Sequence, residues 1–249
     1  FSFGTRFSPN KSSEIRANYS RGNRAPGLSE LVADGIHHGA NRYEIGSKML
    51  EEERSNNFDL GFSHRSSTVD VDVAIFRNSI RDYIFLSPTG NELLGFNVYE
   101  FTSTDAVLKG GEIGLAFSPQ LLPEISLAGS ASYVRGQSVD DNLPWMPPLN
   151  FHSEINWEKT QLRGLKNVFA SISADFTTAT NHVSMGETSS SAYNVVNVIV
   201  GAKVFHHFSV SIAASNLFNT TYIPHLSLIK DLGIPEPGRN INARISFEF

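Results

Sequence analysis

Two segments of the chain combine histidine with carboxylate side chains, and these residue types together can bind a divalent metal ion. The first segment holds His37, His38 and Glu44, and the second holds His225 and Asp231. Neutral imidazole and carboxylate oxygen suit zinc and similar divalent cations. These five residues are therefore candidate metal ligands. An adjacent histidine pair has no fixed ligand spacing of the H-E-x-x-H kind, so a plain surface role for the histidines is the competing interpretation.

Other kinds of chemistry have little support in the sequence. The chain contains no cysteine, which excludes disulfides and cysteine-ligated metals. It contains neither a G-x-S-x-G nucleophile motif nor a phosphate-binding P-loop, and we expect no enzymatic activity and no catalytic residues. The net charge of −5 argues against a nucleic-acid partner.

The candidate ligands must be positioned by β-strands, because apolar and polar residues alternate along most of the chain. Successive side chains of a strand point to opposite faces, so this alternation predicts strands with one apolar and one polar face. The C-terminal segment is the clearest case, and its apolar face holds Ile241, Ala243, Ile245, Phe247 and Phe249.

The alternation predicts about eleven strands, and no run of 18 apolar residues exists that could form a transmembrane helix. A transmembrane strand needs only about 9–11 residues and one apolar face. The predicted strands cover residues 1–8, 13–21, 54–64, 68–84, 98–118, 124–135, 148–158, 167–177, 192–205, 208–217 and 239–249.

The connections between these strands sort by parity. After odd-numbered strands they are short, at 9–12, 65–68, 119–123, 159–166 and 206–207. After even-numbered strands they are mostly longer, at 22–53, 86–97, 136–147, 178–191 and 218–238. Short turns at one end and long loops at the other are typical of an outer-membrane barrel. A soluble β-sandwich is the alternative, but its loops need not sort in this way.

An odd number of strands predicts that this sheet is incomplete. Bacterial single-chain barrels have even strand numbers, and open edges would leave backbone groups unsatisfied in lipid. We therefore expect an all-β, antiparallel, up-and-down transmembrane barrel of about 22 strands, of which residues 1–249 supply the C-terminal eleven. An N-terminal plug and the first half of the barrel are expected to lie outside these residues.

Four segments in order resemble motifs of TonB-dependent outer-membrane receptors, and the resemblance spans essentially the whole chain. They are residues 23–31 (NRAPGLSEL), 50–61 (LEEERSNNFDLG), 76–84 (FRNSIRDYI) and 215–222 (SNLFNTTY). The resemblance implies a receptor in the cell outer membrane that takes up a scarce ligand. It implies a TonB complex acting through the missing plug region. It also implies insertion by the barrel assembly machinery, which would recognise the terminal Phe249.

Two loops resemble the zinc-uptake subgroup of these receptors, namely residues 34–46 and residues 224–231 with 237–240. This resemblance implies zinc as the transported ligand rather than a resident cofactor. The parity of the connections places the five candidate ligands in loops on the predicted extracellular side. Siderophore, haem and cobalamin receptors share the same barrel. A passive porin-like or structural barrel and an outer-membrane hydrolase are alternatives of other classes.

Overall fold

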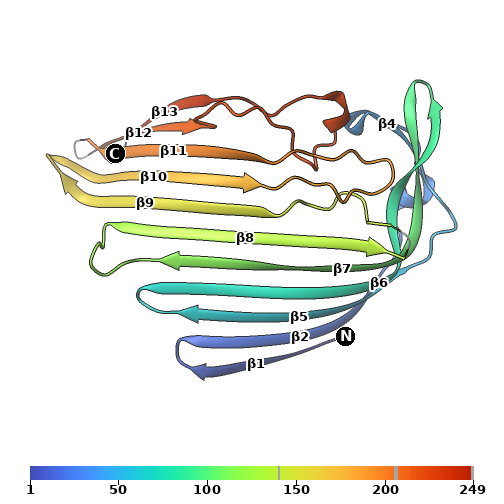
Figure 1. Cartoon of the computed structure of the whole chain (residues 1–249), viewed down its shortest axis with the longest axis horizontal. Helices are drawn as coiled ribbons and strands as arrows, with labels where there is room; N and C mark the ends of the chain where they lie inside the picture. Colours follow the sequence, from blue (N-terminus) through green and yellow to red (C-terminus); the bar gives the residue numbers. More distant parts are fainter. Residues whose placement is uncertain (140, 205–206, 248–249) are drawn as a thin grey trace.

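The computed structural model describes residues 1–139, 141–204 and 207–247, and these residues form one curved antiparallel sheet (Figure 1). Eleven strands lie in sequence order along the wall of this sheet. They are β1 (Ser2–Asn10), β2 (Ser13–Arg24), β5 (Glu53–Arg65), β6 (Val69–Leu93), β7 (Phe96–Phe117), β8 (Ile125–Ser138), β9 (Asn150–Leu162), β10 (Leu165–Thr177), β11 (Tyr193–Lys203), β12 (Phe208–Ser215) and β13 (Asn240–Phe247). The predicted fold class and the eleven wall strands are thereby confirmed. The predicted role of Phe249 falls outside the described residues.

The two ends of the wall differ, as the parity of the connections predicts. Tight turns lie at the left of Figure 1, and the long segments lie at the right. The turn between β9 and β10 consists of Arg163 and Gly164, whose φ angles of 50° and 88° are typical of a two-residue type I′ hairpin. The predicted connection over 159–166 is therefore shorter than expected, because both strands continue to this turn.

The two faces of the wall also differ, since the register keeps side chains of one kind aligned across neighbouring strands. Leu60 pairs with Ala17 on one side and with Ile75 on the other, and all three are apolar. Large apolar side chains are exposed along this outer face, whereas polar residues dominate the opposite, inner face. Over residues 1–139, 141–204 and 207–247, few hydrophobic residues are buried. This arrangement suits a sheet whose outer face contacts lipid.

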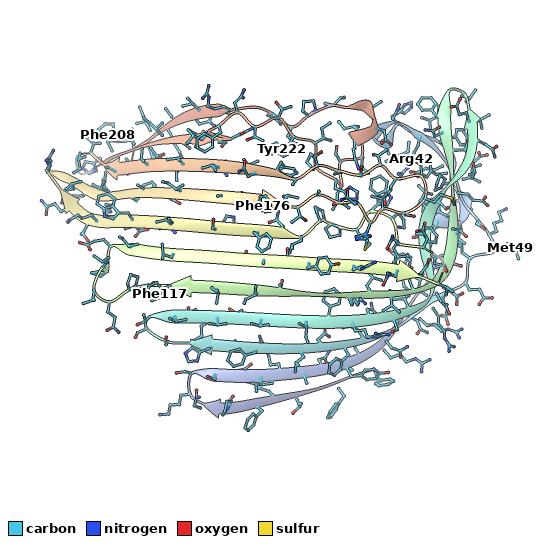
Figure 2. The ribbon with its side chains drawn as sticks, viewed as in Figure 1. Arg42, Met49, Phe117, Phe176, Phe208 and Tyr222 are labelled. Carbon is cyan, nitrogen blue, oxygen red and sulfur yellow. The ribbon has the colours of Figure 1, made fainter. Side chains whose placement is uncertain are left out.

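Aromatic side chains border the outer apolar face at both ends. Phe117 and Phe208 lie near the turns, whereas Phe176 lies nearer to the long segments (Figure 2). The rings of Phe176 and Phe151 are 6.2 Å apart between centroids, and the Phe208 ring is 4.8 Å from that of Phe247. Two aromatic bands around an apolar centre are typical of transmembrane barrels.

The predicted loop over 86–97 is wrong, because β6 and β7 continue beyond the wall as a long hairpin. A bulge at Arg81 and Asp82, which together oppose Asp105, shifts the alternation by one residue. Asp82 has a left-handed backbone with φ of 55°. The apolar–polar pattern changes face at this point, so the regular pattern ends while the strand continues.

The predicted long connection over 22–53 contains regular elements. They are helix α1 (Leu28–Val32), strand β3 (Asp34–His37), the 3-10 helix η1 (His38–Ala40) and strand β4 (Arg42–Ile45). The strands β3 and β4 form a hairpin, and β4 pairs in parallel with β7. A second 3-10 helix, η2 (Lys230–Leu232), lies in the last long segment. None of the helices in the described part of the chain is long and apolar enough to cross a membrane.

Candidate functional site

The long segments leave the wall at one end, and the candidate ligands lie there. The β3–β4 hairpin carries His37 and Glu44, while the segment 216–239 carries His225 and Asp231. Figure 2 shows Arg42 of β4 at this end of the molecule, close to the hairpin of β6 and β7. The sequence thus predicts correctly that both histidine-bearing segments belong to the same end of the sheet.

The first candidate segment brings one histidine close to one carboxylate. The Nδ1 atom of His37 lies 3.6 Å from Oε1 of Glu44. Arg42 donates a hydrogen bond of 2.8 Å from Nε to the same oxygen. His38 begins η1, and the side chain of His37 is half exposed. The carboxylate of Glu44 is therefore already neutralised by a guanidinium, which weakens its attraction for a metal cation.

The second candidate segment contains a buried histidine. The side chain of His225 is only 1% exposed, and its Nδ1 lies 2.9 Å from Oγ of Ser190. Its Nε2 lies 3.7 Å from Oε1 of Glu187. Burial lowers the pKa of His225, and the nearby Lys230 ammonium lowers it further, against the opposing effect of Glu187. His225 is therefore a neutral imidazole at neutral pH.

A lysine ammonium occupies the space beside this imidazole. The Nζ atom of Lys230 lies 3.2 Å from Nδ1 of His225, and it also donates a hydrogen bond to the backbone oxygen of Thr188. Because an ammonium only donates, Nδ1 accepts, and the ring proton is on Nε2 toward Glu187. Thr188 in turn donates a hydrogen bond of 3.4 Å to Asp231. The positive charge of Lys230 thus stands where a cation bound by His225 would lie.

The five predicted ligands are divided between these two places. Within residues 1–139, 141–204 and 207–247, no three histidine, aspartate or glutamate side chains gather closely enough to hold a metal ion. Each place offers one imidazole and one or two carboxylates. Since zinc sites take three or four protein ligands, metal binding here requires movement of the loops or ligands from elsewhere.

A cluster that the sequence does not single out joins the long segments to one another. We call it the loop hub, and it consists of Arg42, Tyr99, Trp145, Glu187, His225 and Lys230. The carboxylate of Glu187 accepts hydrogen bonds from the backbone N–H of Trp145 at 2.9 Å and of Ser184 at 3.1 Å. Glu187 therefore connects three segments, 141–149, 178–192 and 216–239.

The β3–β4 hairpin joins the loop hub through a cation–π contact. The guanidinium of Arg42 lies 5.3 Å from the ring centroid of Tyr99 and 5.8 Å from that of Trp145. A cavity of only about 30 Å³ remains at this place, room for about one water molecule. The loop hub is therefore a packed contact between the long segments, and a larger hollow of about 570 Å³ lies beside it, lined in part by Tyr222, Lys230 and Asp231.

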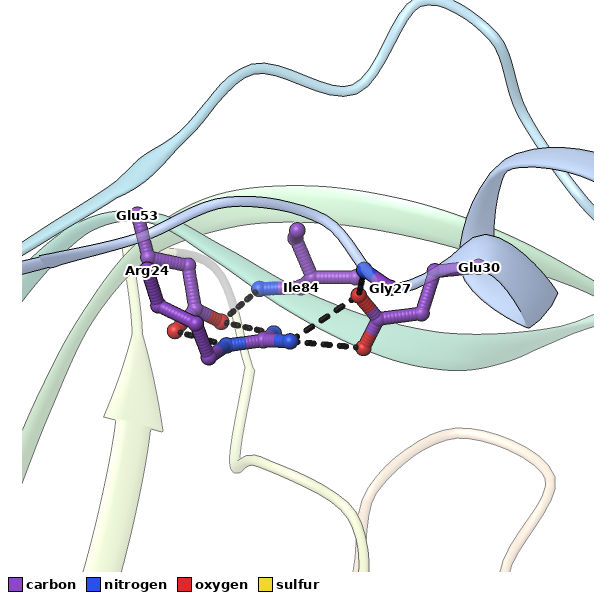
Figure 3. A network of polar contacts seen from close by, with 5 residues as sticks. All are labelled: Arg24, Gly27, Glu30, Glu53 and Ile84. Carbon is purple, nitrogen blue, oxygen red and sulfur yellow. Dashed lines mark hydrogen bonds and ion pairs between the residues drawn. The ribbon is translucent and has the colours of Figure 1, made fainter.

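A network of charges fixes the beginning of the first long segment (Figure 3). Arg24 at the end of β2 donates two hydrogen bonds of 2.7 Å to the carboxylate of Glu53. It also contacts both carboxylate oxygens of Glu30, at 3.0 and 2.9 Å. Glu30 accepts from the N–H of Gly27 at 2.6 Å, and Glu53 accepts from the N–H of Ile84 at 2.8 Å. Three of the four motifs read from the sequence, 23–31, 50–61 and 76–84, thus meet in one network of ion pairs and hydrogen bonds.

A pair of asparagines shapes the start of the last long segment. Asn216 and Asn219 both have left-handed backbones, with φ of 49° and 57°. The buried side chain of Asn216 donates to the backbone oxygen of Thr220 at 2.8 Å and accepts from its N–H at 2.8 Å. The side chain of Asn219 accepts from the N–H of Arg239 at 2.8 Å. This motif therefore ties both ends of the segment 216–239 together.

Comparisons with known proteins agree with this architecture. The family described as "TonB dependent receptor-like, beta-barrel" matches residues 1–217. Among solved structures, the copper transporter OprC superposes with a TM-score of 0.81 at 20% identity, over 100% of this chain and 39% of that chain.

Two further structures are similar over the whole of this chain. The FrpB iron transporter from Neisseria meningitidis (F3-3 variant) has a TM-score of 0.71 at 15% identity, over 39% of its own length. The siderophore receptor PirA from Acinetobacter baumannii has a TM-score of 0.70 at 17% identity, over 40% of its length. At these identities the structures establish a shared fold, and the chain spans about two-fifths of each.

Proposed function

Since the chain belongs to the TonB-dependent receptor-like β-barrel family, we propose that it forms half of the wall and the extracellular loops of an outer-membrane receptor. In this proposal the receptor takes up a scarce small ligand, a metal ion such as zinc or a metal chelate. Energy reaches it from the inner membrane through TonB, because the outer membrane has no ATP of its own. The remaining wall strands, the plug and the TonB contact belong to parts beyond residues 1–249.

One observation carries the proposal: an outward apolar wall whose long segments all converge on a single hub at one end. The loop hub ties the long segments together, and a hollow of about 570 Å³ beside it, lined in part by Lys230 and Asp231, offers room for a small ligand. The wall supports membrane insertion, and the joined loops with this hollow support ligand capture rather than passive flow. The solved structures with this fold bear the names of copper, iron and siderophore transporters or receptors, which supports a metal-related ligand.

The proposed metal ligands are the two groups found at the loops, His37, His38 and Glu44 in one place and His225 and Asp231 in the other. If the loops move so that each group gains the further ligands that zinc needs, zinc binding would draw these segments together. The test is calorimetry of zinc binding to the complete receptor, comparing the wild type with His37→Ala/His38→Ala and with His225→Ala. His182→Ala is the matched control, because His182 is exposed in a neighbouring long segment.

Zinc affinity that falls in either test variant and stays unchanged in the control would support direct metal capture. Unchanged affinity in every variant would exclude these histidines as ligands and leave a metal chelate as the proposed cargo. A cellular uptake assay with and without TonB tests the wider proposal. Uptake that does not depend on TonB would contradict it.

A further inference from the structure

The outer face carries a row of three cations on neighbouring strands near the loop end. Arg77 of β6 pairs directly with Lys109 of β7, and Lys109 pairs directly with Arg135 of β8. The same register places Arg77 opposite the exposed outer residue Phe58, so the row lies on the outer face. We call Arg77, Lys109 and Arg135 the basic row.

The basic row forms no ion pair with a counter-charge in the part of the chain that the structure describes. The Nε atom of Arg135 is buried and has no hydrogen-bond partner. By contrast, Arg54 on the same face contacts Glu52 at 3.0 Å. Arg81, which pairs with Arg54 across β5 and β6, forms no ion pair in the described part of the chain either, so the basic row belongs to a wider unneutralised cationic area on this face.

Like charges directly opposite each other on adjacent strands destabilise a sheet. A row of three such charges is therefore expected to be stabilised by an anion that the chain does not supply. Among the described residues that line the hollow beside the row, the carboxylate is that of Asp105, which accepts a hydrogen bond of 3.3 Å from the N–H of Asp82 in the bulge. One carboxylate leaves a net positive surface at this place.

The position of the basic row indicates what kind of anion it meets. Two residues toward the turns, the same strands present Ile75 and Tyr133 on the exposed apolar face. A hollow of about 670 Å³ lies beside the row, lined in part by Arg77, Arg81 and Lys109 and by the amide side chain of Gln137. The cations thus stand where the apolar surface ends, at the level expected of lipid headgroups.

We propose that the basic row binds a phosphorylated lipid of the outer leaflet, with a headgroup phosphate between its cations and acyl chains on the apolar face below. Guanidinium groups match phosphate through paired N–H donors, and Lys109 adds a point charge between them. A lipid fits better than a free anion because the apolar surface continues directly from the cations. The inference rests on the proposed placement of the wall in the outer membrane.

The test uses the complete receptor purified in detergent and bisphosphorylated lipid A as the probe, with retention measured by native mass spectrometry. The test variant is Arg77→Gln/Lys109→Gln/Arg135→Gln. The matched control is Lys11→Gln/Lys159→Gln/Arg163→Gln, which removes three cations at the turn end of the wall. We expect the test variant to retain lipid A about tenfold less well and the control to behave like the wild type.

A second measurement keeps the inference falsifiable if the triple variant does not fold. The single replacement Lys109→Gln removes the central like charge, so without lipid A the variant should melt at a higher temperature than the wild type. The increase in melting temperature that lipid A causes should be smaller in this variant than in the wild type. Equal lipid retention in wild type and test variant would overturn the proposal. So would equal retention of lipid A from which both phosphates have been removed, since apolar contact alone would then explain it. A receptor that is absent from the outer membrane in the wild type would instead contradict the proposed function.

Discussion

Arg24 and Glu53 face each other across the start of the first long segment and share two hydrogen bonds of 2.7 Å. The side chain of Glu53 is 11% exposed, and it also accepts the N–H of Ile84 in the neighbouring strand. The pair therefore joins β2, β5 and β6 where they leave the wall. It also anchors Glu30, which caps helix α1 through Gly27.

Replacement of Arg24 by alanine should loosen this junction, because it leaves the largely buried Glu53 carboxylate without its counter-charge. We expect a loss of roughly 1.5–3 kcal/mol in the free energy of unfolding and faster hydrogen exchange over 25–52. Arg54→Ala is the control, since its pair with Glu52 is half exposed and should cost less than about 1 kcal/mol. Equal losses of unfolding free energy in the two variants would show that the Arg24–Glu53 pair stabilises the protein no more than an exposed ion pair does.

Acidification should loosen the segment 216–239 through His225. Burial and Lys230 lower the pKa of His225 below its ordinary value of 6.5, so the unfolded chain takes up a proton at a higher pH than the folded chain. The packing is therefore fully stable above pH 6.5 and loses stability as pH falls below it. The exchange rate of 216–239, divided by the intrinsic exchange rate at each pH, should rise as pH falls below about 6.5, measured with a chelator present.

His225→Asn should abolish this pH dependence, whereas the exposed His182→Asn should preserve it. An unchanged pH profile in His225→Asn would assign the effect to another group.

Removal of the Lys230 charge should strengthen zinc binding beside His225, if this place captures metal. The ammonium lies 3.2 Å from the Nδ1 atom that would coordinate the ion. Lys230→Met keeps most of the side-chain volume without the charge, and we expect about tenfold tighter zinc binding by calorimetry. Lys48→Met, in the first long segment, is the control. Weaker binding in Lys230→Met would mean that the lysine organises the site and does not compete with the cation.

Gly201 on the inner face should not tolerate a side chain. A Cβ atom there would lie 2.5 Å from the ring of Phe169 and 3.0 Å from the carbonyl of Val210. Gly201→Ala should therefore cost about 1–3 kcal/mol in the free energy of unfolding, measured by urea denaturation in detergent. Gly114, also on the inner face of a wall strand, has nothing within 4 Å of an added Cβ, and Gly114→Ala should be near neutral. Similar costs for both glycines would contradict the role assigned to the Phe169 ring.

The wall was predictable from the sequence because alternation is a direct consequence of strand geometry. Each strand from β1 to β13 in the wall has one apolar face, and the tight turns interrupt that pattern at the expected intervals. The hairpin over 86–97 was not predictable in this way. The bulge at Asp82 changes the face of the alternation, so the apolar–polar pattern of the wall does not continue into the hairpin, whose tip over 89–95 is exposed.

The candidate site was predictable only in part, since the sequence indicates residue types but not which loops meet. His37 and Glu44 come together because a short hairpin connects them, a local effect. The contact of His225 with Glu187 joins two separate segments, and no local pattern marks Glu187. The sequence does not indicate the basic row, because Arg77, Lys109 and Arg135 are far apart along the chain and only the strand register brings them together.

The parallel pairing of β4 with β7 has a consequence for the order of assembly. Every wall strand pairs with its neighbours along the wall, so the sheet can grow one strand at a time at low entropic cost. The pairing of Tyr43 with Val98 must instead close a loop that contains β5 and β6. The β3–β4 hairpin can therefore pair with β7 only after the β6–β7 hairpin has formed. The loop end of the sheet is thus completed after this part of the wall.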